Sequence, residues 1–82
     1  MYKVELIVKP KPGVRDPQGA AVEESLRGVG YEGVAVHHVG RFLSMQVEAK
    51  SKEDARVRVE EMCKRMLVNP NLETFELTVR DA

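Results

Sequence analysis

The connection between residues 11 and 20 fixes where one strand has to end and one helix has to begin. Asp16 can accept a hydrogen bond from an unpaired N–H of a first helical turn, and Pro17 has no N–H that this turn would leave unpaired. A helix is therefore predicted to begin at Pro17. Upstream, Pro12 and Gly13 remove a backbone donor and permit a tight turn, so the preceding strand is expected to stop before them.

Three basic residues, Lys9, Lys11 and Arg15, surround this boundary. Positive charge beside a helix N-terminus is typical of an anion site, but a solvated capping loop accounts for the same residues. The capping loop is favoured, because the chain has no glycine-rich phosphate motif.

The first strand is predicted over residues 2–9, where side chains alternate between two faces. Val4, Leu6 and Val8 share an apolar face with Tyr2, while the opposite face carries mainly charges. Ile7 is the exception, since it places an apolar side chain on the charged face.

The first helix is expected to bury an apolar stripe formed by Val22, Leu26 and Val29, which recur at i, i+4 and i+7. Gly28 or Gly30 should end it, because either glycine can take the left-handed conformation that closes a helix.

Two β-rich runs after this helix predict a hairpin. They cover residues 34–39 and 42–49, and the intervening pair Gly40-Arg41 suits a type II′ turn, which places glycine first. Phe42 lies on the polar face of the second run. It is the second apolar residue, after Ile7, at a position expected to face solvent.

The second half of the chain predicts one more helix and one more strand. Ser51 and Asp54 form a start similar to a capping box, and the helix is expected to run to about Leu67. The stretch 69–71, Asn-Pro-Asn, stops it, and residues 73–80 alternate as a strand.

The predicted order of elements is β-α-β-β-α-β, which is the ferredoxin-like α+β arrangement of a four-stranded antiparallel sheet with two helices on one face. Ile7 and Phe42 would lie on the uncovered face. This face is therefore predicted to bury itself against a second copy or another protein. An exchange of elements between two chains stays open, because the connections rich in proline and glycine can act as hinges.

The size and charge of the chain limit the number of its domains and the kinds of partner that it can bind. Its 82 residues make a single domain over 1–82, and 13 basic against 13 acidic residues give a net charge of zero, which argues against a nucleic-acid partner. Cys63 is the one cysteine, so no internal disulfide can form. No apolar run suits a membrane span or a signal peptide, so the expectation is a cytoplasmic protein without a membrane partner.

No constellation of residues points to catalysis or to a metal. His37 and His38 would point to opposite faces of a strand and could not share one ion, and their role stays undecided. Cys63 lies on the predicted core stripe of the second helix. On this fold an RNA-binding module and a small-molecule-sensing domain of the ACT type remain open, although Phe42 alone is a poor match to the stacking aromatics of the former.

The residues Gly13-Val14-Arg15-Asp16-Pro17-Gln18-Gly19 resemble the G-V-x-D-P-Q-G signature of PurS, the family of small subunits of phosphoribosylformylglycinamidine synthase. The likeness extends over nearly the whole chain. It includes Gly30, the run 39–41 and the run 67–73, Leu-Val-Asn-Pro-Asn-Leu-Glu. Two positions depart from the family pattern: Arg15 replaces a usually apolar residue, and Arg41 replaces a common lysine.

The resemblance implies a homodimeric, non-catalytic subunit of an ATP-dependent ligase in de novo purine synthesis. It would join a glutaminase subunit, PurQ, to a large synthetase subunit, PurL, so that ammonia passes between them. No cofactor is expected in this chain, and ATP and Mg²⁺ would be used by the large subunit.

The resemblance also implies which residues serve docking between subunits. Gln18 and Arg41 are the strongest candidates, because no turn requires them, whereas the others also suit a structural role. The full set expected to contact the other subunits is Asp16, Pro17, Gln18, Gly19, Arg41, Asn69, Pro70 and Glu73.

Overall fold

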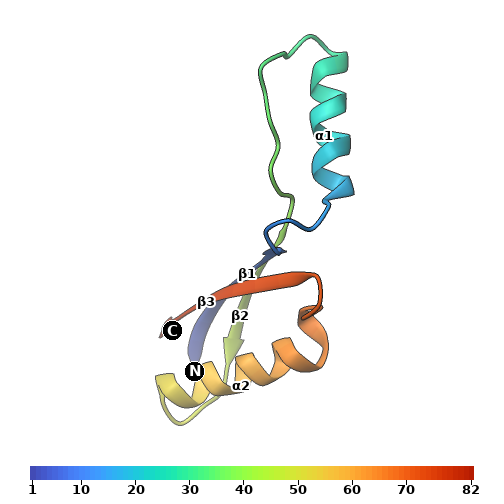
Figure 1. Cartoon of the computed structure of the whole chain (residues 1–82). Helices are drawn as coiled ribbons and strands as arrows, with labels where there is room; N and C mark the ends of the chain where they lie inside the picture. Colours follow the sequence, from blue (N-terminus) through green and yellow to red (C-terminus); the bar gives the residue numbers. More distant parts are fainter.

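A computed structural model describes the whole chain, residues 1–82, as a small α+β structure with a projecting arm (Figure 1). The α+β class and the antiparallel sheet agree with the prediction. In chain order the elements are β1 (Tyr2–Pro10), α1 (Pro17–Gly28), β2 (Arg41–Val47), α2 (Lys52–Met62), a short π-helical turn η1 (Cys63–Leu67) and β3 (Glu73–Asp81).

The body of the molecule, residues 1–12 and 41–82, is a three-stranded sheet covered by α2. The strand order is β2-β1-β3, and both pairs are antiparallel. Leu6 of β1 lies opposite Leu43 of β2 and Leu77 of β3, so the apolar faces of all three strands coincide. The core between this face and α2 is formed by Val4, Leu6, Val8, Val47, Val59, Cys63 and Val68.

Helix α2 begins where the sequence predicts, and the helical segment that it forms together with η1 ends at Leu67, also as predicted. The Ser51 hydroxyl accepts a hydrogen bond from the Asp54 N–H at 3.1 Å, and the Asp54 carboxylate accepts one from the Lys50 N–H at 3.1 Å. The last turn, up to Leu67, is π-helical. Met66, three residues after the buried Cys63, is 81% exposed, because the wider turn carries it away from the sheet.

The arm, residues 14–40, leaves the sheet and returns to it without covering either face (Figure 1). It consists of α1 and an extended return segment, residues 31–40, that runs beside the helix. The radius of gyration is 16.1 Å, whereas a compact domain of this length has about 12 Å. The prediction of two helices on one sheet face is therefore wrong for α1, and only α2 packs on the sheet.

The predicted hairpin is also wrong, because residues 34–39 form no strand. Two carboxylates of the arm bind the backbone that a hairpin would have paired: Glu23 accepts from the Val36 N–H at 3.0 Å, and Asp16 accepts from the Val39 N–H at 2.7 Å. Arg41, expected in the turn, is instead the first residue of β2.

The apolar stripe of α1 stays largely uncovered. Val22 and Val29 are exposed, Val29 by 73%, and Leu26 is half-buried. The helix nevertheless ends as predicted, with Gly30 at φ +100° and the Tyr31 N–H donating to the Leu26 carbonyl at 2.9 Å.

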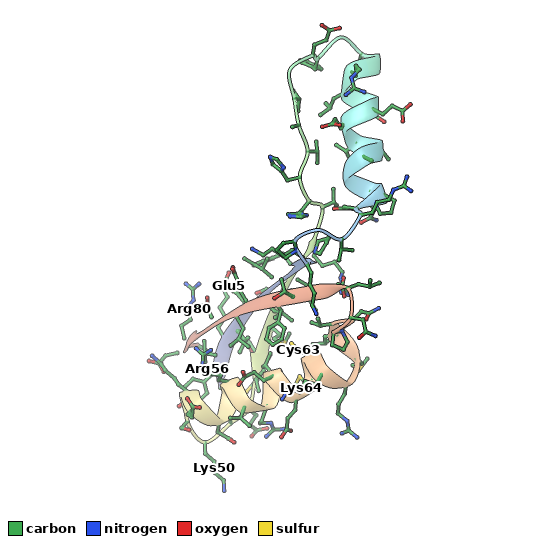
Figure 2. All side chains as sticks on the ribbon, in the orientation of Figure 1. Glu5, Lys50, Arg56, Cys63, Lys64 and Arg80 are labelled. Carbon is green, nitrogen blue, oxygen red and sulfur yellow. The ribbon has the colours of Figure 1, made fainter.

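The outer face of the sheet is open, as expected from the order of elements. Ile7 and Phe42 are directly paired across β1 and β2 and are 44% and 60% exposed. Two charged pairs lie around them, Lys9 with Glu76 at 3.5 Å and Glu5 with Arg80. Figure 2 labels Glu5 and Arg80. No helix in the structure has the length and apolar character needed to cross a lipid bilayer.

Candidate subunit-docking site

An open cleft of about 340 Å³ lies where the arm meets the body. One wall is the loop into α1, and the other is the turn that precedes β3. A hydrogen bond from the Lys11 N–H to the Leu72 carbonyl, 2.9 Å long, ties the two walls together. The lining residues are Pro10, Val14, Arg15, Asp16, Pro17, Gln18, Val39, Asn69, Leu72 and Glu73.

Asp16 organises the first wall. Its Oδ1 accepts from the N–H groups of Gln18 and Gly19 at 3.1 Å each, and its Oδ2 accepts from the Val39 N–H. These bonds favour the charged form, so the pKa of Asp16 lies below its ordinary value of 3.8; the bond from Val39 is the largest cause and nearby His38 adds a small effect. The carboxylate thus occupies the helix N-terminus itself, as a capping loop requires.

Gly19 is buried directly beneath this carboxylate. A Cβ at this position would lie 3.3 Å from the Asp16 Oδ2 and 3.5 Å from the Val36 carbonyl oxygen. The glycine therefore lets the return segment of the arm approach α1 closely. Pro17, at the first helical position, requires no N–H partner.

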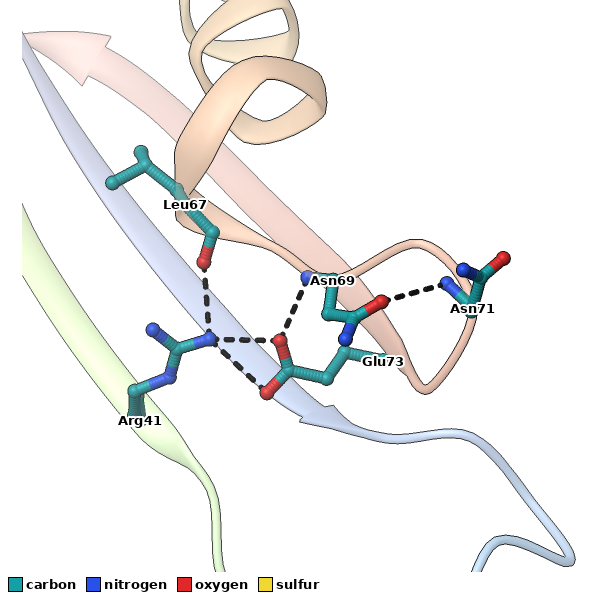
Figure 3. A network of polar contacts seen from close by, with 5 residues as sticks. All are labelled: Arg41, Leu67, Asn69, Asn71 and Glu73. Carbon is teal, nitrogen blue, oxygen red and sulfur yellow. Dashed lines mark hydrogen bonds and ion pairs between the residues drawn. The ribbon is translucent and has the colours of Figure 1, made fainter.

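Glu73 organises the second wall through the network drawn in Figure 3. Arg41 Nη2 donates to both carboxylate oxygens of Glu73, at 2.9 and 3.1 Å, and to the Leu67 carbonyl at 3.0 Å. The Asn69 N–H donates to the Glu73 Oε1 at 2.8 Å. Because β1 lies between β2 and β3, this network joins the two edge strands and the π-helical turn at one end of the sheet.

Asn69 and Pro70 shape the turn between η1 and β3. The Asn69 Oδ1 accepts from the Asn71 N–H at 3.1 Å, as the close-up shows (Figure 3). The Asn69 carbonyl accepts from the N–H groups of Leu72 and Glu73 at 3.1 and 2.7 Å. Pro70 lines a second, smaller cleft of about 140 Å³, which shares Glu73 with the first.

The comparison with known proteins identifies the family of this chain. The profile of PurS, described as phosphoribosylformylglycinamidine (FGAM) synthase, matches residues 3–81. The chain belongs to the PurS family. The PurS subunit of FGAM synthase from Bacillus subtilis is 37% identical over 81 residues, which cover 99% of this chain and 95% of the relative. The corresponding subunit from Methanocaldococcus jannaschii is 33% identical over 96% of this chain and 95% of its own length.

Solved structures of PurS proteins show the same fold. The crystal structure of PurS from Methanocaldococcus jannaschii superposes with a TM-score of 0.89 at 32% identity, covering 100% of this chain and 99% of the other. A chain in the structure of PurLQS from Thermotoga maritima gives a TM-score of 0.84 at 33% identity and 95% coverage of both chains. The arm is therefore a feature of PurS architecture that the sequence pattern of this chain did not predict.

The structure of this PurS-family chain gathers the predicted docking residues at one end of the sheet. Five of them line the large cleft, Arg41 binds one of these five, Gly19 lies beneath the cleft, and Pro70 lines the adjacent one. Their docking role stays a prediction. The cleft residues that the prediction omitted are Pro10, Val14, Arg15, Val39 and Leu72; a half-exposed leucine inside a polar turn is the signal that could have indicated Leu72.

The groups at this site are suited to binding. Gln18 has no side-chain hydrogen bond, and Arg15 is exposed and takes part in no ion pair.

Away from the cleft, Cys63 is fully buried between α2 and the sheet (Figure 2), and burial raises the pKa of its thiol, with a smaller contribution from Glu60. No group of three or more His, Cys, Asp and Glu side chains is arranged to hold a metal ion.

Proposed function

We propose that this chain is the small assembly subunit of FGAM synthase, which holds the glutaminase and the ATP-dependent synthetase of this enzyme together in de novo purine synthesis. The full-length match to the PurS family carries the proposal. A second support is the likeness to a chain of the PurLQS assembly, in which PurS occurs with PurL and PurQ.

The proposed role is structural and not catalytic. Ammonia released from glutamine has to reach a distant acceptor before it escapes or becomes protonated, so the two active enzymes must be held in register. The cleft offers hydrogen-bonding side chains on a fixed frame. ATP and Mg²⁺ would be bound by the large subunit, and the complex would work in the cytoplasm.

Two copies of the chain would form a homodimer through the outer sheet face. This face exposes Ile7 and Phe42 side by side, and an apolar pair on an open sheet is a common site of association. The bare stripe of α1 adds apolar surface that a second copy would cover.

A reconstitution tests the assembly role. The large subunit and the glutaminase are mixed with and without this chain, and FGAM formation is measured once with glutamine and once with ammonium salt. The chain should be required for the glutamine-dependent reaction and dispensable for the ammonia-dependent one. Equal glutamine-dependent rates with and without the chain, or turnover by the isolated chain, would contradict the proposal.

Gln18→Ala tests the docking role of the cleft. The Gln18 backbone N–H, and not its side chain, binds Asp16, so the variant should fold normally while its affinity for the other subunits falls. Glu24→Ala, on the exposed surface of the same helix, is the control and should bind as the wild type does. Unchanged affinity of Gln18→Ala would remove this residue from the docking surface.

A further inference from the structure

We propose that two copies of the chain exchange their arms, so that α1 and residues 34–39 of each copy complete the sheet of the other. Each copy would then hold a four-stranded sheet with two helices, of which one strand and one helix come from its partner. This exchange goes beyond the assembly role above, because it concerns contacts between copies of one chain.

The body lacks two elements of the ferredoxin-like arrangement, and the arm carries both. A strand at residues 34–39 would pair with β2 as its hairpin neighbour, and α1 would lie beside α2 on the inner sheet face, the face that α2 covers. In the strand order β2-β1-β3 one edge of β2 is unpaired. Helix α2 lies closest to β3, and Leu43 and Met45 on the inner face of β2 are half-buried. The edge and the inner face of β2 are therefore open to one more strand and one more helix.

The arm of the same copy does not fill this position, because the chain does not turn back at Gly40. A type II′ turn needs a positive φ at its first central residue, and Gly40 is not among the glycines with positive φ. Arg41 instead enters β2 directly, opposite Val8, while Asp16 holds the Val39 N–H on the other side of the glycine. The helix and the return segment therefore point away from the body (Figure 1).

The arm presents the two surfaces that the open position requires. Helix α1 exposes Val22 and Val29 along its apolar stripe. Residues 34–39 make no backbone–backbone hydrogen bond. The Val36 N–H binds Glu23, but backbone groups alternate along an extended segment, so those of the adjacent residues point away from this bond and can pair with a strand. The helix and the segment can thus join a sheet as one unit.

The exposed area of the chain is large enough to form a stable pair. The chain exposes 6068 Å², whereas a compact 9.2-kDa monomer exposes about 4,900 Å². The excess of about 1,100 Å² per copy gives about 2,200 Å² for two copies, which is in the range of obligate dimers. Reciprocal exchange is also a closed two-fold arrangement, in which each copy gives the elements that the other lacks. A second copy is therefore the partner that this surface fits.

The exchange leaves the outer sheet face open. Ile7 and Phe42 lie on that face, whereas α1 of the partner would cover the inner one. Pairing through the outer face would then join two exchanged pairs. Because the two contacts use different surfaces, a variant can remove one of them and keep the other.

Insertion of Asn-Gly between Gly40 and Arg41 tests the exchange. Asn-Gly forms a type I′ turn, which would let residues 34–39 fold back onto β2 of the same copy. The measurement is the mass in solution by light scattering, at one concentration for all variants, in an Ile7→Lys background that removes pairing through the outer face. The Ile7→Lys chain should be a dimer, and the insertion should halve its mass. The same insertion after Gly30, at the far end of the arm, is the control and should leave the dimer intact.

A crosslink between copies locates the contact without an insertion. A photo-crosslinking residue replaces Val22 in an equal mixture of isotopically labelled and unlabelled chains. It should attach to a peptide of β2 or α2, and this peptide should come from the other copy. The same residue in place of Glu24, on the opposite side of α1, is the control and should give little of this product.

The outcomes separate the exchange from the assembly role. A monomeric Ile7→Lys chain, or a dimer that the insertion at Gly40 leaves intact, would overturn the exchange. A crosslink from position 22 to its own copy, or to a region outside β2 and α2, would overturn it as well, and this crosslink decides if the insertion prevents folding. The assembly role is lost only if glutamine-dependent FGAM formation does not need the chain. Circular dichroism establishes that each variant is folded before its mass is compared.

Discussion

The body and the arm of this molecule are held together by different interactions. Of the nine buried residues, eight are apolar residues of the body and one, Gly19, belongs to the arm. The body therefore depends on removal of apolar surface from water. The arm depends on a capped helix and on two carboxylates, Asp16 and Glu23, that bind the backbone of its return segment.

The difference shows that the arm is incomplete as a unit of folding within one chain. Its helix carries an apolar stripe of the kind that normally packs on a core, yet the stripe faces outward. Local hydrogen bonds set the direction of the arm, and they leave its apolar surface available to other protein surfaces. The following variants test this contrast between body and arm.

Leu6→Ala should lower the stability of the chain more than any other variant described below. Leu6 is fully buried in the central strand, so its truncation leaves a cavity and should lower the free energy of unfolding by about 2–5 kcal/mol. Leu26→Ala, the same change at the one half-buried residue of the apolar stripe of α1, should cost much less in the isolated chain. Urea titrations of both variants at a concentration where the chain is monomeric provide the measurement. Equal losses would mean that the arm is as well packed as the body.

Gly40→Ala should destabilise the junction between arm and body. An added Cβ would lie 2.4 Å from the Val8 carbonyl oxygen, so the backbone of β1 or of the arm has to move, at a cost of about 1–3 kcal/mol. Gly28→Ala is the control, because its Cβ would meet no atom within 4 Å. Thermal unfolding of the two variants distinguishes them, and a Gly40→Ala protein as stable as Gly28→Ala would contradict the close approach.

Asp16→Ala should loosen the arm while leaving the body intact. Hydrogen exchange is the measurement: the amides of Gly19 and Val39 should exchange faster, and those of β1 should keep their protection. Asp16→Asn should keep part of this protection, because its side-chain oxygen can still accept a hydrogen bond. Unchanged protection of Val39 in the alanine variant would exclude the proposed bond.

Acid should release the same contact in the wild-type chain. The folded pKa of Asp16 lies below its ordinary value of 3.8, so the carboxylate stabilises the arm above that pH and loses its effect as the pH falls through the lowered value. An NMR titration of the Val39 amide should follow this transition, and a midpoint above 3.8 would contradict the assignment. Asp16→Asn removes the titrating group and is the control.

Arg41→Ala should have the smallest effect on stability. Its partner network is partly exposed to solvent, so the loss should be about 1 kcal/mol or less. This revises the expectation that Arg41 serves docking alone, since it also joins β2 to β3 through Glu73. Arg41→Lys keeps the charge, and its comparison with Arg41→Ala by denaturation and by subunit binding separates the two roles.

Much of the body could be predicted from the sequence, because its signals are local. The alternation along β1 and β3 reports one buried face each, and the Ser51 cap fixes the start of α2. Asp16 and Pro17 likewise fix the start of α1 to the residue. The family resemblance implied a docking role for residues 16–19, 41, 69, 70 and 73, and the structure shows that these residues lie together at one end of the sheet.

The arm could not be predicted from the same signals. Three of the six residues 34–39 are valines, which favour strands, but strand formation also needs a partner, and β propensity depends strongly on this context. Here the N–H groups of Val36 and Val39 bind side-chain carboxylates 13 and 23 residues away. An alternating pattern of side chains does not indicate that distant carboxylates compete with a neighbouring strand for these N–H groups. The pattern of α1 predicts a helix whether or not its apolar stripe packs on the sheet of its own chain, so it could not predict the arm.

The elongated shape of this chain extends its reach. Its longest dimension is 51 Å, whereas a compact domain of the same length is about 30 Å across. The tip of α1 and the far end of the sheet can therefore touch surfaces that a globular 9.2-kDa protein could not contact at the same time.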